Sequence, residues 1–297
     1  MSPHAALHDL VFGRYVVIVG SLLLLAGLIL GLLLVVFRKR LEAVWMTYLS
    51  WLWLAPLVAL LIFAGRAVFL AGLSIIAILG FREFAHATRM NRDRWVMNTI
   101  YLALLGCGIA LLLQVPSVLI LLPAIIALAA NGALCSLSLG VIALVFFAGM
   151  LGQIGSLANN GNAYGYLCFL FLATELNDVA AFIFGRIFGR HPLLPQVSPH
   201  KTWEGSLGAL AFSLLLPWLL RFSFPFFGAR QLILTGLVIG IGGQLGDLTF
   251  SALKRMLGIK DWSCAIPGHG GVLDRIDSLV FTAPLFSLLA RYYYPDA

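Results

Sequence analysis

Long apolar runs alternate with short charged segments along the whole chain. The runs are about 16–25 residues long, which is the length of α-helix that crosses a ~30 Å hydrocarbon core. The alternating segments of about ten residues that are typical of outer-membrane barrels are absent. The pattern therefore predicts an all-α polytopic membrane protein.

We expect about ten transmembrane helices. They divide the chain into an N-terminal transmembrane scaffold, residues 1–160, which lines the lipid side, and a C-terminal transmembrane region, residues 161–297, which carries the polar motifs described below. The predicted spans are residues 12–37, 47–64, 67–81, 96–113, 117–132, 134–154, 162–184, 204–222, 231–252 and 276–291.

The composition agrees with this class. Hydrophobic residues make up 61% of the 297 positions and charged residues 10%, whereas soluble domains carry about 25% charged residues. The net charge is +7, but the basic residues lie between spans and set orientation, so no nucleic-acid partner is expected. The four cysteines form no C-x-x-C pair, and neither a disulfide framework nor a zinc site is predicted.

The basic residues also predict the orientation. If ten spans alternate, fourteen of the 19 lysines and arginines fall on one side, which the positive-inside rule makes cytoplasmic. Both termini are then expected outside. The N-terminus lacks the basic start of a cleaved signal, and we expect an integral protein of a bacterial inner membrane. The fourteen residues are Arg38, Lys39, Arg40, Arg82, Arg89, Arg92, Arg94, Arg186, Arg190, Lys201, Lys254, Arg255, Lys260 and Arg275.

The segment 82–95 is one of the basic loops expected on the cytoplasmic side. Two interpretations fit it. It is either an anchor that fixes topology at the membrane surface or a site that recruits an anionic lipid headgroup.

Polar side chains gather at the end of the seventh predicted span. Residues 174–178 contain four side chains able to form hydrogen bonds, Asp178 being the last. Ionisable groups inside a membrane usually face a partner or a water-filled cavity. Downstream, residues 185–205 bring glycines, hydroxyls and Lys201 to the start of the next helix, near Thr202. Such donors at a helix N-terminus favour an anion site, and a simple capped turn is the alternative.

The stretch 247–278 carries the strongest signal. Asp274 and Asp277 are three positions apart at a predicted helix start, so both carboxylates are expected on one face, opposite Asp247. An all-oxygen cluster suits Mg²⁺ or Mn²⁺ rather than zinc. The nearby lysines and arginines can clamp phosphate oxygens, and the glycines of 267–271 let the backbone wrap a ligand. These residues predict a metal-dependent enzyme that acts on a lipid phosphate or lipid alcohol, with its active site at the cytoplasmic membrane face.

The order of residues in this stretch resembles the signature of the phosphatidate cytidylyltransferases, or CDP-diacylglycerol synthases. The matching positions are Ser251, Lys254, Arg255, Lys260, Asp261, Ser263, residues 266–271, Asp274, Arg275 and Asp277. The run from Asp178 to Gly205 is similar to a second block of that family, so the resemblance covers residues 165–297. It implies that CTP and phosphatidic acid are converted to CDP-diacylglycerol and pyrophosphate with Mg²⁺, and it leaves a second cation at the same site open.

The resemblance also implies roles for individual residues. The implied metal ligands are Asp247, Asp274 and Asp277. The implied catalytic residues, chiefly phosphate clamps, are Lys201, Lys254, Arg255, Lys260, Asp261 and Arg275. The implied substrate-binding residues are Asp178, Ser198, Thr202, Glu204, Gly268, His269, Gly270 and Gly271. The expected partners are CTP, phosphatidic acid or a related lipid phosphate, membrane lipids and a second copy of the chain in a homodimer.

Three alternatives remain open. A CTP-dependent lipid kinase of the polyprenol or phytol type would need a base for the hydroxyl proton, and Asp178 or Glu175 could serve. A cytidylyltransferase could also take a different lipid phosphate. A transporter could use the same two acids as a pathway, but the charged residues cluster on one face and no inverted repeat is visible.

Overall fold

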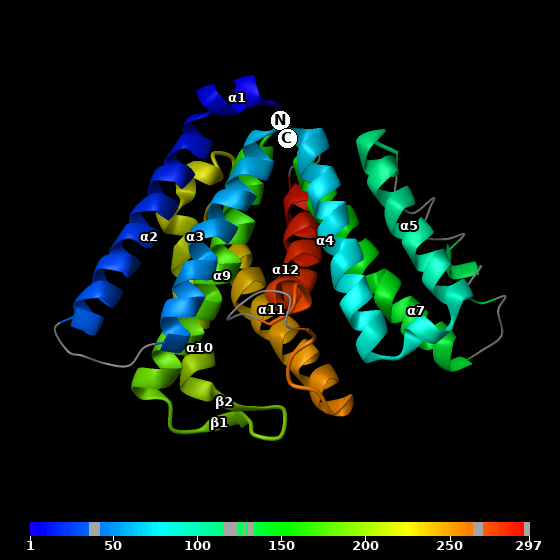
Figure 1. Ribbon diagram of the computed structural model, residues 1–297. Coiled ribbons are helices and arrows are strands. Elements are labelled where there is room, and N and C mark those ends of the chain that lie inside the picture. The colour runs from blue at the N-terminus through cyan, green and yellow to red at the C-terminus, as the bar shows by residue number, and fades with distance from the viewer. Residues whose placement is uncertain (36–41, 116–123, 127–128, 130–133, 264–269, 294–297) are drawn as a thin grey trace.

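The computed structural model describes the chain except for residues 36–41, 116–123, 127–128, 130–133, 264–269 and 294–297. The described part is almost entirely helical (Figure 1). Its α-helices are α1 (Pro3–His8), α2 (Leu10–Val35), α3 (Glu42–Phe63), α4 (Arg66–Ala87), α5 (Arg94–Leu112), α7 (Leu134–Ala143), α8 (Gly149–Ala158), α9 (Ala163–Phe188), α10 (Trp203–Leu219), α11 (Ala229–Met256) and α12 (Leu273–Tyr293).

Three short helical segments and one hairpin complete the described elements. The π-helical turn η2 (Leu144–Ala148) joins α7 to α8, and the 3-10 turns are η1 (Met90–Arg92) and η3 (Arg221–Ser223). The strands β1 (Pro192–Leu194) and β2 (Ser198–Thr202) pair antiparallel.

The prediction of an all-α integral membrane protein is confirmed. Seven helical stretches in the described part of the chain are long and apolar enough to cross a membrane. They are Leu10–Leu34, Val44–Phe63, Arg66–Ala87, Arg94–Leu112, Ser138–Ala158, Ala163–Phe188 and Ala229–Met256. The predicted spans 204–222 and 276–291 coincide with α10 and α12, which are not among the seven. The predicted span 117–132 falls mostly outside the described residues.

Two segments that the sequence predicts as loops contain regular secondary structure. The basic loop predicted at 82–95 is shorter in the structure. Helix α4 continues to Ala87, and only residues 88–93 connect it to α5. The loop predicted before residue 204 contains the hairpin, in which Leu194 pairs with Ser198 and Pro192 with Thr202. The apolar pattern of α4 fades before its last turns, so hydropathy alone ended that helix too early.

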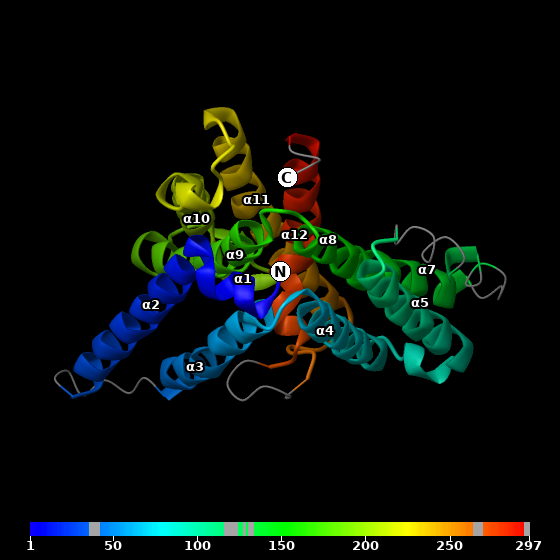
Figure 2. The same cartoon turned by 90° about the horizontal axis from the view of Figure 1, so that it is seen from above.

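The centre of the bundle is formed by α9, α10, α11 and α12, which pack closely against one another. Small residues permit this approach: a Cβ on Gly205 would lie 2.7 Å from the carbonyl oxygen of Ala181. Inside the bundle, the buried Ser213 hydroxyl donates to Asn177 Oδ1 at 3.0 Å. By contrast, the apolar stretch of α2 stays exposed, as expected for a helix that faces lipid. Figure 2 shows α2 and α3 on one side of the centre and α5 and α7 on the other.

Different elements lie at the two ends of the bundle. One end holds α1 and the last turns of α12, and the opposite end holds the β1–β2 hairpin with the end of α11 (Figure 1). The charged segments of the second half therefore meet at the hairpin end.

The arrangement predicts which single cysteines share a side of the membrane. Gln196→Cys, in the hairpin turn, and Met256→Cys, at the exposed end of α11, should react with an impermeant maleimide from one side. His4→Cys in α1 should react only from the other side. Labelling of sealed vesicles of both orientations measures this, and reaction of His4→Cys and Gln196→Cys from the same side would contradict the fold.

Candidate active site

A pocket of about 470 Å³ opens where the hairpin end of α9 meets β1, β2, α10 and α11. Its size is within the range of ligand sites, roughly 300–1,000 Å³. Unlike the apolar surface around it, the pocket brings several charged side chains together. Its lining residues are Asp178, Ala181, Phe182, Gly185, Arg186, Leu193, His200, Lys201, Thr202, Gly205, Ser206, Gln244, Asp247 and Leu248.

An ion pair crosses this pocket. Lys201, on β2, reaches Asp247, near the end of α11, and their side chains are 27% and 31% exposed. Ser251, one turn further along α11, donates to Asp247 Oδ1 at 3.2 Å. The hairpin thus carries its lysine over the carboxylate of a different element, which the sequence spacing of these residues could not indicate.

The start of α12 adjoins the same pocket. The Ser278 hydroxyl donates to Asp178 Oδ2 at 3.1 Å. Asp178, Asp247 and Asp277 lie close enough for their carboxylates to repel one another, and Glu175 shares this negative field. Four acids from α9, α11 and α12 therefore converge at one end of the bundle.

Arg275 offsets part of this charge. Its guanidinium attracts the carboxylates of Glu175 and Asp178. Its Nε is buried and has no hydrogen-bond partner among the described residues. Since buried donors are normally paired, this nitrogen could serve an anionic oxygen of a ligand.

The acids offer the ligand type that Mg²⁺ prefers, namely carboxylate oxygens. The described residues nevertheless contain no group of three His, Cys, Asp or Glu side chains at ligand spacing. Asp178, Asp247 and Asp277 thus interact electrostatically but are not at ligand spacing. A bound cation would have to draw their carboxylate oxygens closer together. The donor set fits a magnesium ion in kind.

Asp274, expected beside Asp277 among the metal ligands, has other partners in the structure. Its Oδ1 accepts from Lys254 Nζ at 2.7 Å, and its Oδ2 accepts from the backbone N–H groups of Gly271 and Trp262 at 2.8 and 3.1 Å. The Lys254 and Asp274 side chains are only 12% and 8% exposed. Asp274 thereby ties the end of α11 and the loop before α12 to the first turn of α12.

Two glycines of the predicted nucleotide cradle pack against carboxylates of the protein itself. Gly270 has φ of 79°, a left-handed conformation that favours glycine, and a Cβ there would lie 2.6 Å from Asp274 Oδ2. A Cβ on Gly271 would lie 2.5 Å from Glu83 Oε2. Gly268 and His269 lie outside the described residues.

Other predicted site residues hold the hairpin. Thr202 caps α10 by accepting from the N–H of Gly205 at 3.2 Å, and Arg255 Nε donates to the carbonyl of Val197 at 3.1 Å. Glu204 accepts from the backbone N–H of Arg190 at 3.1 Å and pairs with His191 at 2.5 Å. Glu204 thus joins the start of α10 to the residues that precede β1.

The structure brings Asp178, Lys201, Thr202 and Asp247 to one pocket, with Arg275 and Asp277 beside it. Lys260 and Asp261 are exposed on the loop after α11, and Ser198 lies half-buried on β2 outside the lining residues. Sequence reasoning did not assign roles to several residues that lie here. They are Glu83, Arg186, His200, Gln244 and Ser278. Arg186 and Ser278 sit next to singled-out motif residues, and that adjacency was the available signal.

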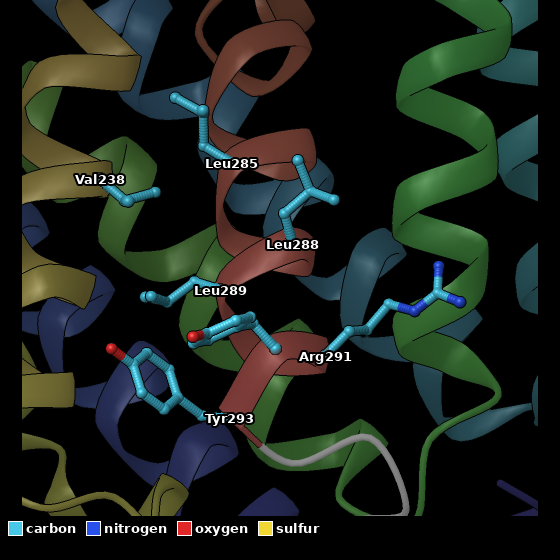
Figure 3. Close-up of a pocket in the computed structure, with 7 residues that line it drawn as sticks. Val238, Leu285, Leu288, Leu289, Arg291 and Tyr293 are labelled. Carbon is cyan, nitrogen blue, oxygen red and sulfur yellow. The ribbon is translucent and has the colours of Figure 1, made fainter.

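A second pocket lies far from these charges. It has a volume of about 610 Å³ and is lined by Val238 of α11 and by the last turns of α12, including Leu285, Leu288 and Tyr293 (Figure 3). Arg291 is its one charged residue, and Figure 3 shows that side chain pointing away from Val238. This pocket lies at the end of α12 opposite the acids, so it is not the candidate active site.

The fold and the site together define an integral membrane protein with a charged pocket at one end of its helices. Residues 45–293 match the Cytidylyltransferase family, and the chain belongs to this family.

Individual relatives match a shorter part of the chain than the family model does. The chain is 43% identical over 133 residues to the phosphatidate cytidylyltransferase of Staphylococcus haemolyticus, covering 44% of this chain and 51% of that protein. It is 45% identical over 125 residues to the enzyme of the same name from Staphylococcus saprophyticus, covering 42% and 48%. It is also 44% identical over 124 residues to the uncharacterized protein YnbB of Escherichia coli, covering 42% of each chain. The chain thus matches about half the length of these relatives.

The Lys254–Asp274 pair should be important for stability, because each partner would leave an uncompensated buried charge if the other were removed. We expect Lys254→Met or Asp274→Asn to destabilise the fold by about 3–5 kcal/mol, and the double substitution by less than either. Thermal unfolding in detergent measures this, with the exposed Lys260→Met as the matched control. Additive losses in the double variant would show that the two side chains act independently.

Proposed function

We propose that the protein transfers CMP from CTP to phosphatidic acid, giving CDP-diacylglycerol and pyrophosphate. The observation that carries the proposal is the ion-paired pocket of Lys201 and Asp247, which stands beside Asp178, Arg275 and Asp277. It combines cations for phosphates with acids for a metal in a member of the Cytidylyltransferase family. The names of the staphylococcal relatives support phosphatidate as the acceptor.

Each side chain has a role in this proposal. Lys201 and Arg275 bind phosphate oxygens of CTP and of the lipid, and Arg186 and His200 line the pocket within reach of the same ligand. Asp178, Asp247 and Asp277 hold a magnesium ion, which supplies charge neutralisation at the phosphates when it is bound. Asp274, also expected as a metal ligand, would have to give up Lys254 and two backbone N–H groups to bind a cation.

The reaction needs little covalent chemistry from the protein. A phosphate oxygen of the lipid attacks the α-phosphorus of CTP, and the bond to pyrophosphate breaks. The lipid phosphate is already a nucleophile, so no general base is assigned. Positioning and charge neutralisation by the basic side chains therefore carry the catalysis.

We further propose the setting of this site. The pocket faces the cytoplasm at a bacterial inner membrane, since the basic residues gather at the hairpin end. The seven apolar helices, α10 and α12 then cross the membrane, and the tenth span is the one expected from the sequence at 117–132, which falls mostly outside the described residues. The N-terminal 160 residues line the lipid side, residues 161–297 form the catalytic region, and two copies of the chain associate.

Labelled CTP tests the reaction. With vesicles of phosphatidic acid and Mg²⁺, label on the α-phosphate of CTP should enter the lipid fraction, because CMP is transferred. Label on the γ-phosphate should leave as pyrophosphate. Recovery of γ-label alone in lipid would identify a CTP-dependent lipid kinase instead, and a panel of lipid phosphates and alcohols as acceptors defines the lipid.

The acids can be tested one at a time. Asp277→Asn should stay folded and lose more than about tenfold in rate at saturating Mg²⁺, because one charge that holds the metal is gone. Initial rates over a Mg²⁺ titration measure this, with Asp9→Asn as a control for a general charge effect, because Asp9 lies before α2 and accepts from the N–H of Phe12 there. A rate within about threefold of the wild type would exclude Asp277 from the metal site.

A further inference from the structure

Glu83, in the last turns of α4, contacts a segment almost two hundred positions away in the chain. Its Oε1 accepts from the Ser263 hydroxyl at 2.6 Å and from the backbone N–H of Val272 at 3.0 Å. Its Oε2 accepts from the backbone N–H of Leu273 at 2.8 Å. Three donors from the loop before α12 and from the first residue of α12 thus converge on one carboxylate.

These hydrogen bonds satisfy backbone N–H groups at the start of α12 that have no acceptor within the helix. The first N–H groups of a helix have no intrahelical acceptor, and a negative charge at that end is favourable. α12 obtains this charge from a different helix, because Glu83 belongs to α4. The close approach explains Gly271, where a Cβ would lie 2.5 Å from Glu83 Oε2.

A second contact runs parallel to the first. Phe84, the next residue of α4, is buried and its ring centroid lies 5.9 Å from that of Trp262. Asp274 binds the same loop from the other direction, through the N–H groups of Trp262 and Gly271. The described residues on either side of 264–269 are therefore held between α4 and the first turn of α12; they are Trp262, Ser263, Gly271 and Val272.

The first turns of α12 carry side chains of the candidate site. Arg275 and Asp277 follow Leu273 by two and four positions, and Ser278 donates to Asp178 of α9. Any shift of the start of α12 moves these groups relative to Lys201 and Asp247, which belong to β2 and α11. The position of α12 thus decides whether the two halves of the site meet.

We infer that Glu83 is a positioning residue of the active site. It acts from the N-terminal half of the chain by fixing the start of α12, and it touches neither CTP nor lipid. This inference rests on the proposed transfer reaction for its kinetic test. It assigns a function in catalysis to a helix that sequence reasoning treated as scaffold.

The kinetic signature separates positioning from mere stability. In Glu83→Gln the side-chain amide N–H₂ replaces one acceptor oxygen, so the three donors can no longer all be satisfied. We expect kcat to fall about tenfold or more and the KM for CTP to rise by less than kcat falls, because Lys201 and Asp247 stay in place on β2 and α11 while Arg275 and Asp277 shift with α12. The matched control is Asp93→Ala, which removes an acid that caps α5 by accepting from the N–H of Val96. That variant should lower the unfolding temperature without lowering kcat.

The outcomes are distinct. Wild-type kcat in Glu83→Gln, or a loss of kcat in Asp93→Ala of the same size, would overturn the positioning role. If the wild-type protein transfers no label at all, the proposed reaction fails, and the contact is then judged by tryptic cleavage after the exposed Lys260. Faster cleavage in Glu83→Ala than in both the wild type and Asp93→Ala supports the role of Glu83 in fixing this segment. Equal rates in all three overturn it.

Discussion

The structure depends on compensating charge at the end of an apolar bundle. An ionised group costs about 2.5–3.5 kcal/mol at the centre of a membrane, and more where no partner or water reaches it. The structure meets this cost with ion pairs between elements, Lys201 with Asp247 and Lys254 with Asp274. Glu83 instead accepts from backbone N–H groups. Each of these contacts joins segments that are distant in sequence, so the same interactions that offset charge also assemble the site.

The basic side chains do not balance all of the negative charge at the pocket. The proposed function depends on this unbalanced charge. Arg275 attracts Glu175 and Asp178, while the cations nearest to Asp178 and Asp277 otherwise are Lys201 and Lys254. Both lysines are already paired, with Asp247 and Asp274, so negative charge is left over at the pocket. A divalent cation would balance this excess, and the phosphates of a nucleotide would then satisfy Lys201 and the buried Nε of Arg275. In this view a bound metal and a bound nucleotide depend on each other, which suits an enzyme whose substrates are both anionic.

Much of this could be predicted from the sequence. Hydropathy located the helices, since a span must be apolar along its whole length whatever its neighbours are. The motif residues Asp178, Lys201 and Asp247 were singled out because charge is rare in such a chain, and the structure places them in one pocket. The partners of Asp274 were not predictable. Helical spacing indicates that Asp274 and Asp277 share a face, but it does not indicate which donors bind their carboxylates. Glu83 was missed for a related reason: it is one acid in a basic segment, and its three donors lie in a segment that only folding brings near.

The glycines show the same limit. Gly270 and Gly271 were expected to wrap a nucleotide, because glycine allows close approach of any group. In the structure the groups that approach are the carboxylates of Asp274 and Glu83. Composition identified where the backbone must be unhindered, and the fold determined what fills the space.

Direct binding of CTP tests the central claim, that the pocket of α9, β2 and α11 holds the nucleotide. Equilibrium dialysis of labelled CTP against the detergent-solubilised protein, with Mg²⁺ and with a chelator, measures it without turnover. Binding should need the cation and should weaken about tenfold in Lys201→Ala, the loss expected for one charge-assisted contact. Leu288→Ala, in the pocket at the far end of α12, should bind CTP as the wild type does. Unchanged affinity in Lys201→Ala, or binding that Leu288→Ala abolishes, would show that CTP does not bind in the pocket of α9, β2 and α11.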